Sequence, residues 1–228
     1  DSGAVYQLGD SAQILVQGAS TFTISKGADF IGGIASEIVV DSLSTLCVYD
    51  TAKLRREARL IVRPGGKLIV NGGTLTNACD GEMWQGIIVE GNANLPQYAQ
   101  LQGSVILNNA TIENAHNAIS TRSADSNALY SHTGGIIQAT NTTFRNNRRA
   151  AEFLEYENHY GSNVTDNTSR FTRCTFTVDD DNLFASNGTS FLEHVSMWRV
   201  RGVKFNGCDF RNETTGTSVR GTGIRSIE

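Results

Sequence analysis

The chain has 228 residues, 39% of them hydrophobic, and a formal net charge of −4 at pH 7. Its 23 Gly and only 2 Pro suit many short strands joined by tight bends, because Gly tolerates left-handed backbone there. The acidic balance provides no basic excess for nucleic acid or anionic lipid, and no apolar run approaches the ~20 residues of a membrane-spanning helix. We therefore expect neither nucleic-acid binding nor membrane insertion.

Two short apolar alternations recur at a regular stride through residues 13–83. The steps are 24 and 22 residues, and the paired positions are Ile14 with Val16 and Phe22 with Ile24, then Ile38 with Val40 and Leu46 with Val48, then Leu60 with Val62 and Leu68 with Val70. A repeat of this length, built from period-2 strands without a helical pattern, predicts a solenoid in which each repeat forms one coil.

The same unit continues in longer repeats through residues 84–228. A large apolar residue follows each first strand at a constant offset, at Leu75, Ile112, Phe144, Phe176 and Phe210. The residue at the bend before it is expected to be left-handed, and these bend residues are Gly72, Asn109, Asn141, Arg173 and Gly207. A third strand is expected around Ile87, Ile119, Ala151, Phe184 and Ile224. The sequence thus predicts about seven coils of three strands, with like residues stacked on like.

Two further positions follow from this stacking. Asn recurs two residues beyond the large apolar position, at Asn77, Asn114, Asn146 and Asn212, where side-chain amides can pass hydrogen bonds from coil to coil. Cys174 and Cys208 occupy one inward position in neighbouring coils, about 4.8 Å apart. Either a disulfide or a pair of stacked thiols fits this spacing.

This pattern resembles the right-handed parallel β-helix of the pectin-lyase-like superfamily. The stretch from Ala58 to Asn77, followed by Trp84-Gln-Gly-Ile-Ile-Val89, is also similar to secreted and surface-exposed β-helix proteins of the Bacteroidetes. The resemblance covers residues 36–91 closely and the rest by pattern. It implies an all-β, single-stranded parallel β-helix solenoid and a secreted or cell-surface location.

We interpret residues 1–228 as one β-helix domain. Residues 1–12 are expected to form a partial N-terminal cap, residues 13–83 short coils, and residues 84–228 long coils with insertions. The chain stops on a third-strand pattern, and bare strand edges invite pairing with other chains. We therefore expect a fragment of a longer chain, or end-to-end stacking with another chain or domain.

The extra residues of the long coils fall between the third strand and the next first strand, at about 90–103, 120–133, 155–167 and 185–199. Because coils stack in register, these loops are expected on one side of the tube, and loops on rigid scaffolds often bind ligands. Their candidate residues for binding a glycan or a surface protein are Tyr98, Tyr130, His132, Tyr156, His159, Tyr160, His194 and Trp198. Packing of the loops onto the tube explains the same side chains equally well.

Two acidic clusters are candidates for chemistry. Asp179, Asp180 and Asp181 stand at a bend, and paired acids can bind Ca²⁺ or act as general acid and base on a polysaccharide. Glu155, Glu157 and His159 project from one side of an extended segment and are candidate metal ligands. Ordinary solvated turns have the same composition, so we expect no cofactor, with Ca²⁺ as the alternative.

The sequence favours a non-catalytic module. It contains no Asn-Thr-Asp, Gly-His-Gly or Arg-Ile-Lys triplet, which a polygalacturonase-like site would need. We therefore expect a secreted or cell-surface β-helix with a structural or adhesive role, which binds a glycan or protein through the insertion side. The alternative is a polysaccharide lyase or glycoside hydrolase, since the fold alone does not determine activity.

Overall fold

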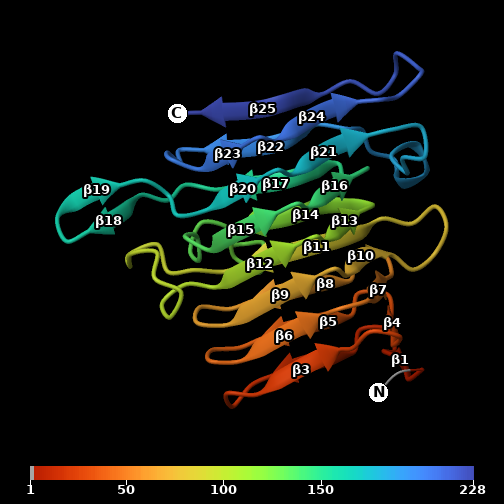
Figure 1. Ribbon diagram of the computed structural model, residues 1–228, viewed down its shortest axis with the longest axis horizontal. Helices are drawn as coiled ribbons and strands as arrows, with labels where there is room; N and C mark the ends of the chain where they lie inside the picture. The colour runs from red at the N-terminus through yellow and green to blue at the C-terminus, as the bar shows by residue number, and fades with distance from the viewer. Residues whose placement is uncertain (1–2) are drawn as a thin grey trace.

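The computed structural model describes residues 3–228, which form a right-handed parallel β-helix (Figure 1). Three parallel sheets, here named A, B and C, run along the tube, and each full coil adds one strand to C, then A, then B. No helix in the described part of the chain is long and apolar enough to cross a bilayer.

The strands of each sheet pair with their equivalents one coil above and below. Sheet A consists of β1 (Val5–Gln7), β4 (Asp29–Gly32), β7 (Thr51–Leu54), β10 (Thr74–Asn77), β13 (Thr111–Glu113), β16 (Thr143–Arg145), β21 (Thr175–Val178) and β24 (Asp209–Asn212). Sheet B consists of β2 (Gln13–Val16), β5 (Glu37–Val40), β8 (Arg59–Val62), β11 (Trp84–Val89), β14 (Ala115–Thr121), β17 (Arg149–Phe153), β22 (Glu193–Trp198) and β25 (Thr222–Ile227). Sheet C consists of β3 (Thr21–Ile24), β6 (Thr45–Val48), β9 (Lys67–Asn71), β12 (Ser104–Asn108), β15 (Ile136–Thr140), β20 (Arg170–Thr172) and β23 (Lys204–Asn206).

The predicted column of large apolar residues is confirmed. Leu75, Ile112, Phe144, Phe176 and Phe210 follow one another in register along sheet A. The Phe144 and Phe176 rings stack with centroids 4.9 Å apart, and the Phe176 and Phe210 rings with centroids 4.7 Å apart. Parallel strands in register place the side chains of equivalent positions directly over one another, so the core is a set of such columns.

The predicted bend residues are also confirmed. All five have positive φ, from 48° at Asn109 to 71° at Gly72. Arg173 adopts φ 51° although it is neither Gly nor Asn, because stacking on the bends above and below fixes its backbone.

The predicted asparagine column is shorter than expected. Asn114 Nδ2 donates to Asn77 Oδ1 at 2.8 Å, but Asn146 turns to Asp179 instead, through bonds of 2.7 and 2.9 Å. Val178 replaces Asn in the next coil and is buried, so the amide relay ends there.

The predicted third strand at Phe184 is wrong. β22 supplies that strand, and its Val195 pairs in register with Ala151. The insertion of this coil therefore lies before the third strand, at 179–192, where it contains the short 3-10 turn η1 (Ala185–Asn187). Phe184 instead packs with Met83, Val178 and Phe191 in a small separate core. A long polar loop hid the strand, whose own alternation is broken by Glu193 and His194.

The other three insertions follow the third strand, as predicted, and lie together on the left of Figure 1. The one after β17 contains a hairpin of β18 (Asn158–Tyr160) and β19 (Asn163–Thr165). At the N-terminal end, β1 extends sheet A by pairing with β4; the expected cap begins with residues 1 and 2, which lie outside the described residues.

Cys174 and Cys208 are free thiols in this structure. They lie at equivalent positions of adjacent coils, since the Asp209 amide donates to the Cys174 carbonyl at 2.9 Å. Burial, together with the neighbouring Cys208, raises the pKa of Cys174 to about 11, so this thiol stays protonated and acts as a small core side chain.

Candidate functional site: a groove on sheet B

A β-bulge gives the later strands of sheet B a distinct outer face. Gly86 pairs with Asn117, but the next residue, Ile87, pairs with Ile119, so β14 carries one extra residue. Gly86 has φ 111°, and a Cβ there would overlap the Asn117 carbonyl. The bulge is kept in β17, where Ala150 and Ala151 both face the core. Consequently outward residues of β17 stand three apart rather than two.

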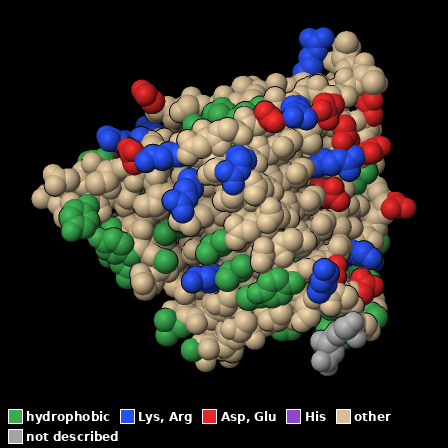
Figure 2. Space-filling view, viewed as in Figure 1, with side chains coloured by type: hydrophobic (Ala, Val, Ile, Leu, Met, Phe, Trp, Pro, Cys, Tyr) green, Lys and Arg blue, Asp and Glu red, His purple; other side chains and the backbone are tan. Residues whose placement is uncertain are grey.

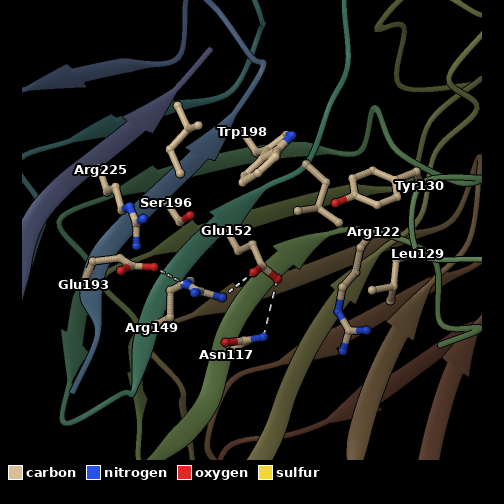
Figure 3. A pocket seen from close by; sticks show the side chains of 12 residues that line it. Asn117, Arg122, Leu129, Tyr130, Arg149, Glu152, Glu193, Ser196, Trp198 and Arg225 are labelled. Atoms are coloured by element: carbon tan, nitrogen blue, oxygen red, sulfur yellow. Dashed lines mark hydrogen bonds and ion pairs between the residues drawn. The ribbon is translucent and has the colours of Figure 1, made fainter. Parts of the chain in front are cut away.

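This spacing brings charged side chains together outside the tube. Arg149 and Glu152, three residues apart, form an ion pair, and Arg149 Nε also donates to Glu193 Oε1 at 2.6 Å. The three side chains are 15%, 12% and 4% exposed. One guanidinium thus holds one buried and one partly buried carboxylate from neighbouring strands (Figure 3), a geometry that fixes all three side chains.

The charged cluster lies in a groove of about 410 Å³ on the outer face of β14, β17, β22 and β25. We name it the sheet B groove; it is lined by Asn117, Arg122, Leu129, Tyr130, Arg149, Glu152, Leu154, Glu193, Ser196, Trp198, Arg225 and Ile227. Tyr130 and Trp198 are 52% and 39% exposed. Figure 3 shows both aromatic rings on the same side of the sheet as the charged cluster.

The loop at 122–135 limits the groove on the side of the early coils. Its Ala124 packs on a buried outer patch of Val39, Ile61 and Ile88, and Arg59 donates to the Ala124 carbonyl at 3.3 Å. The early coils of sheet B are thus covered there, whereas the later coils stay open. A second opening of about 290 Å³, the Arg59 hollow, is lined by Ala35, Glu37, Glu57, Arg59, Gln85 and Arg122.

One buried polar atom of the groove lacks a hydrogen-bond partner among the described residues. Asn117 Nδ2 donates to Glu152 Oε2 at 3.4 Å, but Asn117 Oδ1 is buried without a hydrogen-bond partner in the described part of the chain. Buried polar atoms in proteins are nearly always bonded. The floor therefore retains capacity to accept a hydrogen bond.

Of the predicted binding residues, the structure brings only Tyr130 and Trp198 to this groove. Trp198 lies on β22 rather than in the predicted loop, so its predicted setting is corrected. Tyr98 and Tyr160 are exposed on the insertion side. Tyr156 is buried there and its hydroxyl donates to the Leu95 carbonyl at 2.7 Å; burial raises the pKa of Tyr156 to about 12. That tyrosine packs the loops together.

The predicted histidines are dispersed. His194 belongs to β22, not to a loop, and is packed inside the tube between Phe176, Phe191 and Phe210. Its Nε2 donates to the Arg211 carbonyl at 3.0 Å. His132 bonds Ser131 Oγ through Nδ1 at 2.8 Å. Neither ring faces the sheet B groove.

The candidate metal ligands separate in a similar way. His159 Nε2 lies 3.1 Å from Glu157 Oε1, whereas Glu155 pairs with Arg199 at 3.5 Å. Within residues 3–228, no three His, Cys, Asp or Glu side chains are arranged to hold a metal ion.

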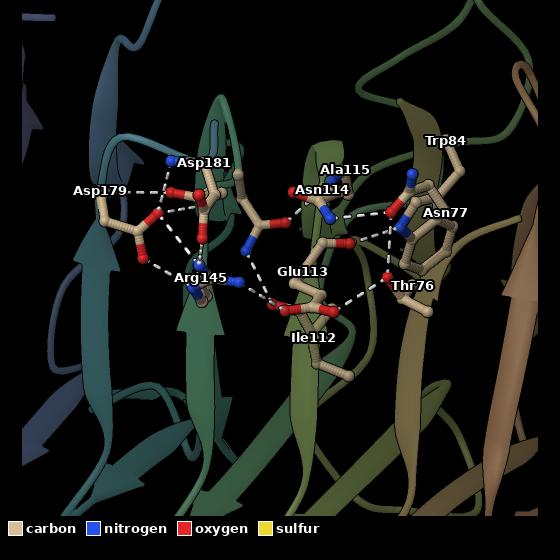
Figure 4. A network of polar contacts seen from close by, with 12 residues as sticks. Thr76, Asn77, Trp84, Ile112, Glu113, Asn114, Ala115, Arg145, Asp179 and Asp181 are labelled. Carbon is tan, nitrogen blue, oxygen red and sulfur yellow. Dashed lines mark hydrogen bonds and ion pairs between the residues drawn. The ribbon is translucent and has the colours of Figure 1, made fainter. Parts of the chain in front are cut away.

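The predicted acidic turn belongs to a network at the corner between sheets A and B, which we name the Arg145 corner (Figure 4). Arg145 bonds Asp179 and Asp181, each at 2.7 Å, and approaches Glu113 at 3.6 Å. Asp180 accepts hydrogen bonds from the Thr215 backbone N–H and hydroxyl at 3.0 and 2.8 Å. All three acids thus bond to residues of neighbouring coils.

The outer face of sheet C carries exposed basic side chains. Figure 2 shows Lys and Arg side chains dispersed over the visible face of the molecule, with hydrophobic side chains in small separate groups. Arg170 and Lys204 lie in register there and are exposed, as the alternation predicts.

Sequence reasoning missed the charged lining of the sheet B groove: Arg122, Arg149, Glu152, Glu193 and Arg225. These residues are far apart in the chain and match no motif. One signal was available, because Ala150-Ala151 lies between Arg149 and Glu152, and two adjacent inward residues flanked by charges indicate a bulge.

Searches against protein-family models, curated proteins and solved structures found no match for this chain.

Proposed function

We propose that this protein is a non-catalytic glycan-binding β-helix module and that the sheet B groove is its binding site. The observation that carries the proposal is the pairing of two exposed aromatic rings, Tyr130 and Trp198, with a floor of fixed charged groups. Aromatic faces cover the apolar faces of sugar rings, while charged and amide groups bond the hydroxyls. Tyr, Trp and Arg are also the residues that most often dominate binding energy.

The lining supports binding rather than catalysis. Glu152 and Glu193 are both bonded to Arg149, so their oxygens serve mainly to hold that guanidinium. At the Arg145 corner, the acids of the alternative hydrolase or lyase are likewise engaged by Arg145 and Thr215. Membership in the pectin-lyase-like superfamily is part of the proposal, supported by the three-sheet coil and the stacked core columns.

A location outside the cell is a further part of the proposal. It is supported by the resemblance to secreted and surface-exposed β-helix proteins. Protease treatment of intact source cells is expected to remove the protein from the cell surface, or the medium is expected to contain it. Recovery of the protein only from lysed cells would contradict this part.

The binding site is tested by calorimetric titration with neutral and acidic oligosaccharides. We expect wild-type protein to bind at least one class, and Trp198→Ala to weaken that binding roughly tenfold or more, as for central aromatic contacts. Tyr160→Ala is the matched control, since Tyr160 is 69% exposed in the hairpin on the insertion side. Equal affinity of wild type and Trp198→Ala, or loss in Tyr160→Ala instead, would move the site away from the groove.

The enzymatic alternative is tested in the same samples. Incubation with and without Ca²⁺ is followed by assays for reducing and unsaturated ends. We expect none. Turnover that disappears in Glu152→Gln would make the groove a hydrolase site, and turnover that disappears in Asp180→Ala would make the acidic turn the catalytic one.

A further inference from the structure

Arg122 is the least satisfied of the charged residues that are at least partly buried in the sheet B groove. It directly follows β14, and its Nε donates to Ser120 Oγ at 3.2 Å. Within residues 3–228, its guanidinium makes no other hydrogen bond and no ion pair. A guanidinium carries several N–H donors, so most of those of Arg122 remain free.

Folding does not explain this arrangement. A partly buried cation without a carboxylate partner costs free energy, and burial lowers the pKa of Arg122, with nearby Glu152 opposing and Arg59 adding to that shift. Arg149 shows the satisfied alternative, because two carboxylates bond it in the same groove. A charge that no protein group compensates, inside a binding groove, is typical of a residue that binds the ligand at some cost in stability.

The position of Arg122 also favours contact with a ligand. It lines both the sheet B groove and the Arg59 hollow, so it lies where the two openings meet. Arg225, on the last strand of sheet B, lines the groove as well, is exposed, and forms no ion pair with any residue of 3–228. The groove thus contains three Arg but only two Glu, and both Glu are bonded to Arg149.

We propose that Arg122 binds an anionic group, a carboxylate or a sulfate, of an acidic glycan seated in the sheet B groove. This inference rests on the proposed function and names the ligand class. The planar guanidinium fork matches the paired oxygens of either group, and such charge-assisted bonds are stronger than neutral ones. The ligand's charge also compensates the desolvated cation.

The experiment compares three oligosaccharide series of equal length: uronate-containing, sulfated and neutral. Titration calorimetry is performed with wild-type protein, Arg122→Gln and Arg170→Gln. Arg170 is the matched control because it is an exposed arginine on sheet C, and its substitution changes the net charge equally. We expect an acidic series to bind best, and Arg122→Gln to weaken it roughly tenfold or more, whereas Arg170→Gln leaves it unchanged.

A thermal unfolding scan shows whether each variant folds. We expect Arg122→Gln to be at least as stable as wild type, because the substitution removes a charge without a partner. The two acidic series identify which anionic group is bound. Equal binding of acidic and neutral series, or unchanged affinity in Arg122→Gln, would overturn this inference but leave the glycan site in place. If no series binds to wild type, the proposed function fails and this inference fails with it.

Discussion

Arg145 and Arg149 lie on neighbouring faces of one coil and form similar networks with very different surroundings. Arg145 joins three carboxylates at a corner, and its partner Asp181 is 81% exposed. Arg149 joins the buried Glu193 and the partly buried Glu152, beside two exposed aromatic rings. Figure 3 shows the Arg149 network, and Figure 4 shows the Arg145 network.

The comparison separates a structural role from a binding one. The Arg145 corner consists of polar side chains that connect one coil to the next. The sheet B groove combines charge, aromatic surface and an unsatisfied cation in one hollow. An ion-pair network is therefore informative about binding only together with what surrounds it.

The largest expected difference between the two networks is in stability. Arg149→Met leaves Glu152 and Glu193 buried without their cation, and losing one partner of a buried pair costs about 3–5 kcal/mol. Arg145→Met leaves more exposed acids, and we expect a loss of about 1–2 kcal/mol, as for charged hydrogen bonds near the surface. Urea unfolding of both variants measures the two losses.

The two variants are matched controls for each other, since each replaces an arginine by a side chain of similar length. Equal losses would mean that burial does not distinguish the networks. A larger loss in Arg145→Met would make the corner, rather than the groove, the more desolvated of the two.

The sequence predicts the tube because stacking repeats the same signal in every coil. Leu75, Phe144 and Phe176 recur at one offset from the first strand, so the pattern of each coil supports the prediction for the next. The strand β22 breaks that signal with Glu193 and His194, so the pattern wrongly predicts this strand at Phe184. Where one coil departs from its neighbours, the period carries no information about it.

The groove was harder to predict for a related reason. The acids at 179–181 are adjacent in the chain and form a visible cluster in the sequence, whereas Arg149 and Glu193 meet only through the register of β17 and β22. The bulge that places Glu152 on the same outer face as Arg149 depends on Gly86, 63 residues before Arg149 in the chain. Long-range register of this kind is visible only after the whole tube is assembled.

A second, smaller effect is expected of acid on the stability of the folded state, through buried histidines. His194 is the inward neighbour of Glu193, and burial lowers its pKa below the usual 6.5, although its bond to the Arg211 carbonyl opposes this. The unfolded state therefore takes up a proton first, and stability falls as the pH drops below about 6.5. Burial lowers the pKa of His116 in the same way, with Arg148 contributing.

Urea midpoints between pH 8 and 5 test this expectation. We expect the wild-type midpoint to fall with pH, His194→Gln to reduce the slope, and His116→Gln with His194→Gln to reduce it further. An unchanged slope in His194→Gln would show that this ring is not held neutral inside the tube.

The smallest effect is expected from acid at the Arg145 corner. Burial alone would raise the pKa of Asp179, but hydrogen bonds from Asn146 and Arg145 outweigh it and lower that pKa below its usual 3.8. The stabilisation is therefore complete above about pH 3.8 and is lost as the pH falls through the lower pKa of the folded state.

Asp179→Asn should be less stable than wild type at pH 5 to 7, and the difference should shrink below pH 3.8. Asp125→Asn, in the exposed loop over sheet B, is the control for the removal of one surface carboxylate. A constant difference at every pH would mean that Asp179 acts through its shape and hydrogen bonds and not through its charge, and the corner would then differ from the groove in chemistry as well as in exposure.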